Sequence, residues 1–174
     1  MNIMSNEFVT FGLSYDASKL TEKHPMSDYI ENSLHKPNGL WACVRTYDGE
    51  DEYNSQWSEW CKNEMFNIEK LKFGFSFKLK PTAKILVIEH LDDIKPFVTE
   101  GLDLVDDLMS CLYGRQIKVD FERIYKEYDG MFVAYFENYI EFYTSMFNSY
   151  DVDSLIVWNS EVIEDVNQFK QVVQ

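Results

Sequence analysis

The sequence predicts a single α+β domain with a mixed sheet over residues 1–174. Short apolar or alternating segments typical of strands recur along the chain, separated by segments with helical spacing. Strands and helices do not alternate regularly, as they would in a doubly wound fold. Apolar residues make up 45% of the chain, and it contains no internal repeat or linker rich in proline, glycine or serine. One compact domain with its own core is therefore expected.

The first predicted strand is Phe8–Leu13, and Gly12 within it indicates a place where a backbone or a ligand approaches closely. A short helix is expected after Ser27. The apolar run Leu40–Val44, with its tryptophan and valine, is typical of a buried strand. An acidic loop, residues 48–52, separates this strand from the next helix.

Asn54 or Ser55 is the predicted N-cap of that helix. Its apolar residues recur at i, i+3, i+4 and i+8 and share one face: Trp57, Trp60, Cys61 and Met65. We expect both tryptophans to face the sheet.

Two strands are predicted in the middle of the chain. Phe73–Leu79 alternates apolar residues with Gly, Ser and Lys, which is the clearest period of two in the sequence. Lys84–Glu89 is apolar throughout its middle, which predicts a central strand. The connection 80–83 is short, so we expect the two strands to be neighbours.

The last third of the chain alternates between segments with the helical spacing of apolar residues and segments with the pattern of strands. Helices are expected at 99–112, 118–127 and 137–148, and strands at 131–136, 155–158 and, at an edge, 169–173. Residues 162–166 are expected to form a short helix or coil.

The formal net charge is −14, and the acidic residues are concentrated outside the lysine-rich stretch 62–84. This argues against direct nucleic-acid binding through a broad basic face. Two interpretations remain: the charge keeps the protein in solution, or the acidic surface imitates nucleic acid and inhibits a partner by occupying its basic groove. We favour the first.

No metal, membrane or export signal is found in the sequence. Its cysteines and histidines lack zinc-ligand spacing, and neither a signal peptide nor an apolar run of about 20 residues occurs. The three cysteines, without a CxxC pair, indicate reduced thiols in a cytoplasmic protein. Glycine-rich phosphate motifs are absent as well.

The tryptophans are the strongest indication of a site, since three fall within 20 residues: Trp41, Trp57 and Trp60. Aromatic faces can hold a planar ring such as nicotinamide or adenine. A large aromatic core is the alternative, and physical reasoning alone favours it.

Several segments resemble the ADP-ribosyltransferase fold family. Gly39–Cys43, followed by Ser55 and Trp57 at a helix start, resembles the family's second motif, in which a strand with an aromatic residue precedes a loop and a serine. Val152–Ile163 is similar to its third motif, and Phe8–Leu13 stands at the place of the first. The order of the segments is that of the family.

The resemblance implies a mixed split sheet with helical insertions, and NAD bound in a cleft between two half-sheets. It implies that Trp41 stacks on nicotinamide, that Ser55 supports the pocket, and that ADP-ribose is passed to a protein or nucleic acid. The cofactor-binding residues that it implies are Thr10, Gly12, Gly39, Trp41, Ser55 and Trp57.

The chain departs from the family at two places. Thr10, Phe11 and Gly12 stand where the first motif has a His or Arg that holds the NAD ribose or phosphates. Ser154 stands at the place of the catalytic Glu, and Asp153, on the opposite face of the strand, is the candidate acidic group. A non-enzymatic acidic binding protein is therefore the alternative function.

Overall fold

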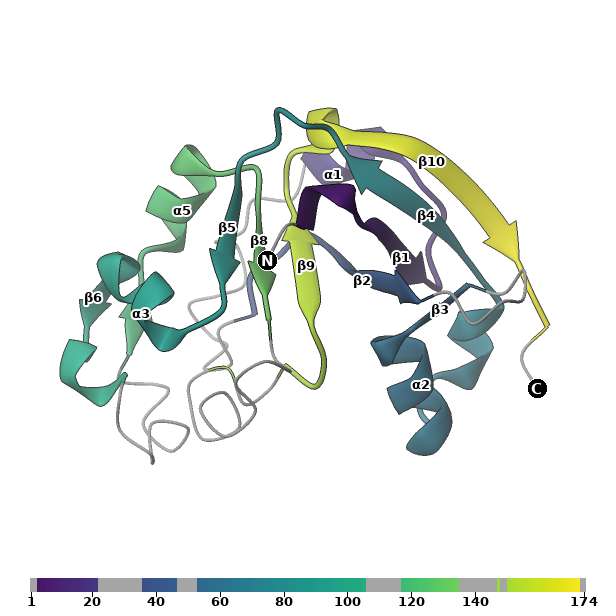
Figure 1. The fold of residues 1–174 in the computed structure, drawn as a ribbon, viewed down its shortest axis with the longest axis horizontal. Helices are drawn as coiled ribbons and strands as arrows, with labels where there is room; N and C mark the ends of the chain where they lie inside the picture. Colours follow the sequence, from purple (N-terminus) through teal and green to yellow (C-terminus); the bar gives the residue numbers. More distant parts are fainter. Residues whose placement is uncertain are drawn as a thin grey trace.

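The computed structural model describes residues 3–21, 36–46, 53–105, 117–134, 147 and 150–172. These form a small α+β domain built on one mixed sheet with few helices (Figure 1). The strands are β1 Glu7–Phe11, β2 Leu40–Thr46, β3 Asn54–Ser55, β4 Phe73–Leu79, β5 Ile85–Ile88, β6 Val98–Glu100, β7 Lys118–Val119, β8 Gly130–Val133, β9 Ser154–Val157 and β10 Ile163–Lys170. The α-helices are α1 Ala17–Thr21, α2 Gln56–Asn63, α3 Leu91–Ile94 and α5 Phe121–Glu127. The 3₁₀ turns are η1 Ile3–Ser5, η2 Ile68–Lys72, η3 Lys95–Phe97, η4 Leu102–Leu104 and η5 Ser160–Val162.

Strand β2 joins two halves of the main sheet, whose order is β10-β4-β1-β2-β9-β8-β5. Its first residues, Leu40–Ala42, pair with β9, whereas Cys43 and Val44 pair with β1. We call β10, β4 and β1 the first half-sheet, and β9, β8 and β5 the second half-sheet; they lie on either side of β2 in Figure 1. Only β5 and β8 pair in parallel within the described chain.

The sheet is curled, as the connection between β4 and β5 requires. Five strand spacings separate these strands in the sheet order, which in a flat sheet would be about 24 Å. Residues 80–84 make six Cα steps between Leu79 and Ile85, and these reach about 21 Å when fully extended. A turn in which Ala83 donates its N–H to the Lys80 carbonyl oxygen shortens the connection further.

The predicted pairing of β4 with β5 is therefore wrong. A short connection favours neighbouring strands, but here it crosses between the ends of a curled sheet (Figure 1). The central position predicted for β5 is also wrong, because β5 ends the strand order. Its apolar run has another cause: Leu86 and Ile88 pack in one core cluster, and Ile85 and Val87 pack against another.

The concave face of the sheet holds the cluster against which Ile85 and Val87 pack. Phe8 of β1 is fully buried, and its ring centroid lies 5.8 Å from that of Phe77 and 6.4 Å from that of Phe132. Phe132 belongs to β8, three strands along the sheet order, so this contact exists because the sheet is curled. The other cluster, which contains Leu86 and Ile88, packs α3 and α5 against the second half-sheet, and Ile94 and Ile124 are fully buried in it.

Helix α2 begins where the sequence predicts, at the N-cap Ser55. Its buried residues are Ser58 and Cys61, whereas Trp57 and Trp60 are half-buried and stack on each other with centroids 5.0 Å apart. The predicted four-residue face is thus wrong in part, because the helix ends at Asn63 and Met65 lies beyond it, 80% exposed.

Other differences lie at element ends. Gly12 follows β1 with a φ of 73° and is not part of the strand. The helix expected from residue 99 begins instead with β6 and η4, and α5 begins three residues later than predicted, after β7. A single strand, β10, replaces the coil and edge strand expected at 162–173, with a bulge between Glu164 and Asn167. The helices expected after Ser27 and at 137–148, and the loop 48–52, lie outside the described residues or almost wholly so.

None of the helices in the described part of the chain has the length and apolar character that crossing a membrane requires.

Candidate functional site

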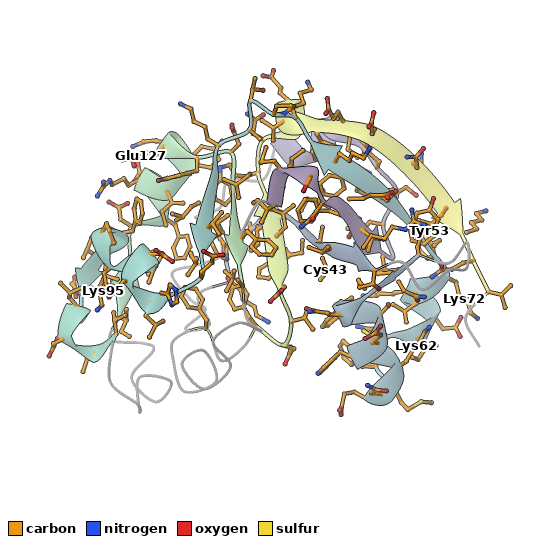
Figure 2. All side chains as sticks on the ribbon, in the orientation of Figure 1. Cys43, Tyr53, Lys62, Lys72, Lys95 and Glu127 are labelled. Carbon is orange, nitrogen blue, oxygen red and sulfur yellow. The ribbon has the colours of Figure 1, made fainter. Side chains whose placement is uncertain are left out.

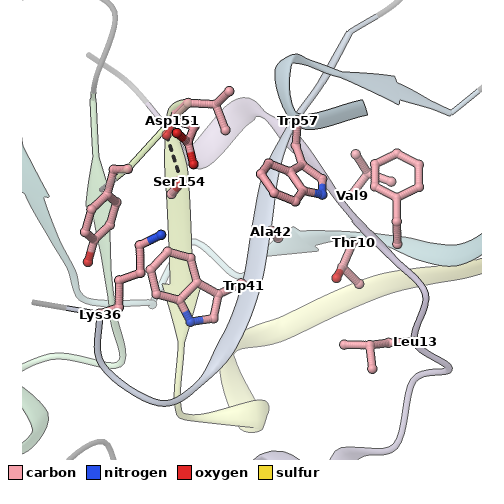
Figure 3. A pocket seen from close by; sticks show the side chains of 12 residues that line it. Val9, Thr10, Leu13, Lys36, Trp41, Ala42, Trp57, Asp151 and Ser154 are labelled. Atoms are coloured by element: carbon pink, nitrogen blue, oxygen red, sulfur yellow. Dashed lines mark hydrogen bonds between the residues drawn. The ribbon is translucent and has the colours of Figure 1, made fainter. Parts of the chain in front are cut away.

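A pocket opens beside β2 where the two half-sheets part. The pairing of β1 with β2 covers Phe8 and Val9, whereas β1 continues beside β4 to Phe11. The pocket has a volume of about 320 Å³, which lies at the lower end for small-molecule sites. Its lining comes from β1 and the residues after it, from β2 and the residues before it, from α2, and from the start of β9 and the segment before it (Figure 3): Val9, Thr10, Phe11, Leu13, Lys36, Trp41, Ala42, Trp57, Tyr150, Asp151, Val152 and Ser154.

Aromatic rings form two walls of the pocket. Trp41 of β2 lies 5.3 Å from Tyr150 between ring centroids, and its indole N–H donates to the Pro37 carbonyl oxygen at 3.2 Å. That hydrogen bond fixes the ring orientation. Trp57 of α2 faces the pocket from the other side (Figure 3), and its stacking on Trp60 supports it there.

The backbone of Phe11 presents a donor and an acceptor on the pocket side. The Gly12 N–H donates to the Phe73 carbonyl oxygen, so it faces β4. The Thr10 carbonyl oxygen also faces β4, because a Cβ added at Gly74 of that strand would collide with it. The N–H and C=O across a trans peptide point in opposite directions. The N–H and C=O of Phe11 therefore point away from β4. They lie on the side of β1 that faces β2, beyond the last residue of β1 that pairs with β2.

Lys36 brings a positive charge into the pocket. Its ammonium nitrogen lies 5.8 Å from the centroid of Trp41 and 5.6 Å from that of Tyr150. Burial lowers the pKa of Lys36, and the Asp151 carboxylate opposes this shift in part. Cation–π contacts of this kind stabilise a partly desolvated ammonium but do not replace a hydrogen-bond acceptor.

The acidic group that lines the pocket is Asp151, which is exposed. Ser154 lies beside it (Figure 3) and donates its hydroxyl to the Val152 carbonyl oxygen at 2.8 Å. Asp153, between them in sequence, is buried, and its N–H donates to the Gln56 side chain. Its negative charge contributes to the raised pKa of Cys43, about 12, for which burial is the main cause (Cys43 is labelled in Figure 2). Asp153 therefore lies near α2 and is not part of the pocket lining.

The structure brings together four of the eight predicted site residues. Thr10, Trp41, Trp57 and Ser154 line the pocket. The other four, Gly12, Gly39, Ser55 and Asp153, are not among its lining residues. Gly39 packs against β9, where a Cβ would lie 2.7 Å from Ile156 Cγ2, and Gly12 turns the chain after β1 beside Lys70.

Ser55 has a structural contact that explains its position. It is fully buried and caps α2: its hydroxyl accepts from the Ser58 N–H at 3.2 Å, while its own N–H donates to the Ser58 hydroxyl at 2.9 Å. This reciprocal pair satisfies two backbone donors at the helix start.

Replacing Ser55 with Ala is therefore expected to lower the free energy of unfolding by about 1 kcal/mol, as measured by urea denaturation. Ser18→Ala in the exposed helix α1 is the matched control and should change it by less than about 0.5 kcal/mol. Equal stability of the two variants would contradict a capping role.

Three pocket residues lie outside every segment that the sequence analysis singled out: Lys36, Tyr150 and Asp151. Each lies just before a strand that was predicted, β2 or β9. Position next to a predicted strand end was the signal that could have indicated them, because functional side chains often sit in such connections.

No group of three or more potential metal ligands occurs among the residues that the structure describes. The chain matches no known protein-family model, and neither the curated proteins nor the solved structures compared with it include a match.

Proposed function

We propose that the chain is an ADP-ribosyltransferase-like domain that binds NAD or a related nucleotide in the pocket beside β2. One observation carries the proposal: Thr10, Trp41, Trp57 and Ser154, from segments far apart in the sequence, line the same pocket. The resemblance implies a cleft between two half-sheets. A sheet whose halves part at β2 supports the split sheet that the resemblance predicts.

The chemistry of the pocket suits a nucleotide. Trp41 and Trp57 offer faces for a planar ring, and base–aromatic stacking contributes about 1–3 kcal/mol for each base. The N–H and C=O of Phe11 can bond a planar amide or a base edge, which carry both an acceptor and a donor. Lys36 supplies a cation for the negative part of the ligand.

The proposed reaction is transfer of ADP-ribose. The nicotinamide leaves with the electron pair of its bond to the ribose, and a nucleophile on a protein or nucleic acid takes its place, losing a proton. A carboxylate stabilises the positive charge that develops on the ribose. In the described lining of the pocket, Asp151 is the residue that can supply one, and Ser154 beside it can hold a ribose hydroxyl.

Calorimetric titration of NAD into the purified protein tests the binding. We expect a dissociation constant between micromolar and sub-millimolar, with release of nicotinamide on longer incubation with NAD. Binding without release would leave a nucleotide-binding protein and remove the transferase. Absence of binding at millimolar NAD would overturn the proposal and favour the alternative, in which the acidic surface binds a basic partner. A complex of that kind should weaken steeply as the salt concentration rises.

A further inference from the structure

Lys36 differs from the other charged residues described because its ammonium lies against aromatic rings rather than against a carboxylate. Its ammonium lies near the faces of two rings, Trp41 and Tyr150, at 5.8 and 5.6 Å from their centroids. No hydrogen bond or ion pair links it to another residue in the described part of the chain. The exposed lysines that do form ion pairs, such as Lys126 with Glu122 at 2.6 Å, contrast with it.

Among the described residues, none accepts a hydrogen bond from the Lys36 ammonium. Each such donor that is removed from water costs free energy unless a partner takes its place. The Asp151 carboxylate acts on it electrostatically, but that carboxylate is exposed to solvent. Figure 3 shows the Lys36 nitrogen turned into the pocket toward Asp151 and Ser154, and so toward the space that a ligand would fill.

The positive charge of Lys36 also restricts which ligands can bind in the pocket. A ring that stacks on Trp41 lies close to the ammonium, and a positively charged ring such as oxidised nicotinamide would be repelled by it. A phosphate oxygen bound to Lys36 would cancel that repulsion and satisfy the free donors. The ring and the phosphate would then bind together, one to the aromatic wall and the other to the lysine.

We propose that Lys36 binds a phosphate group of the ligand, so that the pocket selects nucleotides over nucleosides. This rests on the proposed nucleotide binding and assigns the group that recognises the anion. In the described pocket lining, Lys36 is the single cationic side chain, so the selection depends on one residue.

Two matched ligand pairs test it, adenosine with ADP and nicotinamide riboside with nicotinamide mononucleotide. Within each pair, the ratio of dissociation constants measured by calorimetry gives the effect of the phosphate. In the wild type we expect the nucleotide to bind about 10 to 100 times more tightly than its nucleoside. Lys36→Met, which keeps the apolar stem, should reduce that ratio to about threefold or less while nucleoside affinity stays within about threefold.

Two further variants complete the test. Lys36→Arg should retain most of the ratio, and Lys126→Met, which removes the same charge from the exposed face of α5, should retain all of it. Thermal melts check that each variant is folded. An unchanged ratio in folded Lys36→Met would overturn the inference while nucleotide binding stands. Failure of the wild type to bind these four ligands and NAD would overturn both.

Discussion

Replacing Phe8 with Ala is expected to lower the free energy of unfolding by about 3–5 kcal/mol. Phe8 is fully buried, and its ring contacts Phe77 in the first half-sheet and Phe132 in the second. The variant loses both the transfer free energy of the ring and the contacts across the cavity that the ring leaves. Because a small domain is stable by only about 5–15 kcal/mol, this loss is a large share of the total.

Urea denaturation followed by circular dichroism measures the effect. Val172→Ala, at a side chain that is 78% exposed, is the control and should change the free energy by less than about 0.5 kcal/mol. Phe8→Leu should cost less than Phe8→Ala, since it leaves a smaller cavity. A loss below about 1 kcal/mol in Phe8→Ala would show that the two half-sheets do not share one core at this ring.

Replacing Trp41 with Ala is expected to weaken nucleotide binding by about 1–3 kcal/mol, or about 5- to 150-fold. The ring forms one wall of the pocket, and its hydrogen bond to Pro37 holds it in place before a ligand arrives. Its removal takes away the stacking face and also the contact that Lys36 and Tyr150 make with it. Titration of NAD into the variant measures the loss.

Two comparisons separate stacking from general damage. Trp41→Phe keeps a smaller face and should lose less than half as much binding free energy. Phe66→Ala removes an aromatic ring that packs on Trp57 and Trp60 but is not among the pocket-lining residues, and it should bind nearly as the wild type does. Wild-type affinity in a folded Trp41→Ala protein would remove the ring from the binding site.

Local features of the fold were predictable because they depend on neighbours in the sequence. The alternation at Phe73–Leu79 gave β4 with its exact bounds, and the polar residue before the Trp57 helix gave the N-cap. Strand order was not predictable in this way. The position of β5 depends on pairing with β8, which lies more than 40 residues away, and a buried edge strand has the same apolar pattern as a central one.

The same distinction holds for the candidate site. Trp41 stood out within a strand whose apolar pattern could be read, and Ser154 was selected through the family resemblance, at the place just before the predicted strand 155–158. Lys36 and Asp151 lie outside the strands whose pattern could be read, and only the fold brings the segments before β2 and β9 to one pocket. Ser55 was selected for its place at a helix start, and the contact it makes there is with the helix itself.

The short connection 80–84 has a consequence for how a ligand would enter. The two halves of the sheet are linked by the shared strand β2, by this connection between β4 and β5, and by the connection that runs from β9 through η5 to β10. Two half-sheets linked at several places cannot rotate apart about a single hinge. Entry then requires rearrangement of a few side chains rather than domain opening, and such rearrangements take place in nanoseconds rather than microseconds to milliseconds. Association should accordingly follow a single phase limited by encounter, with no slow closing step after it.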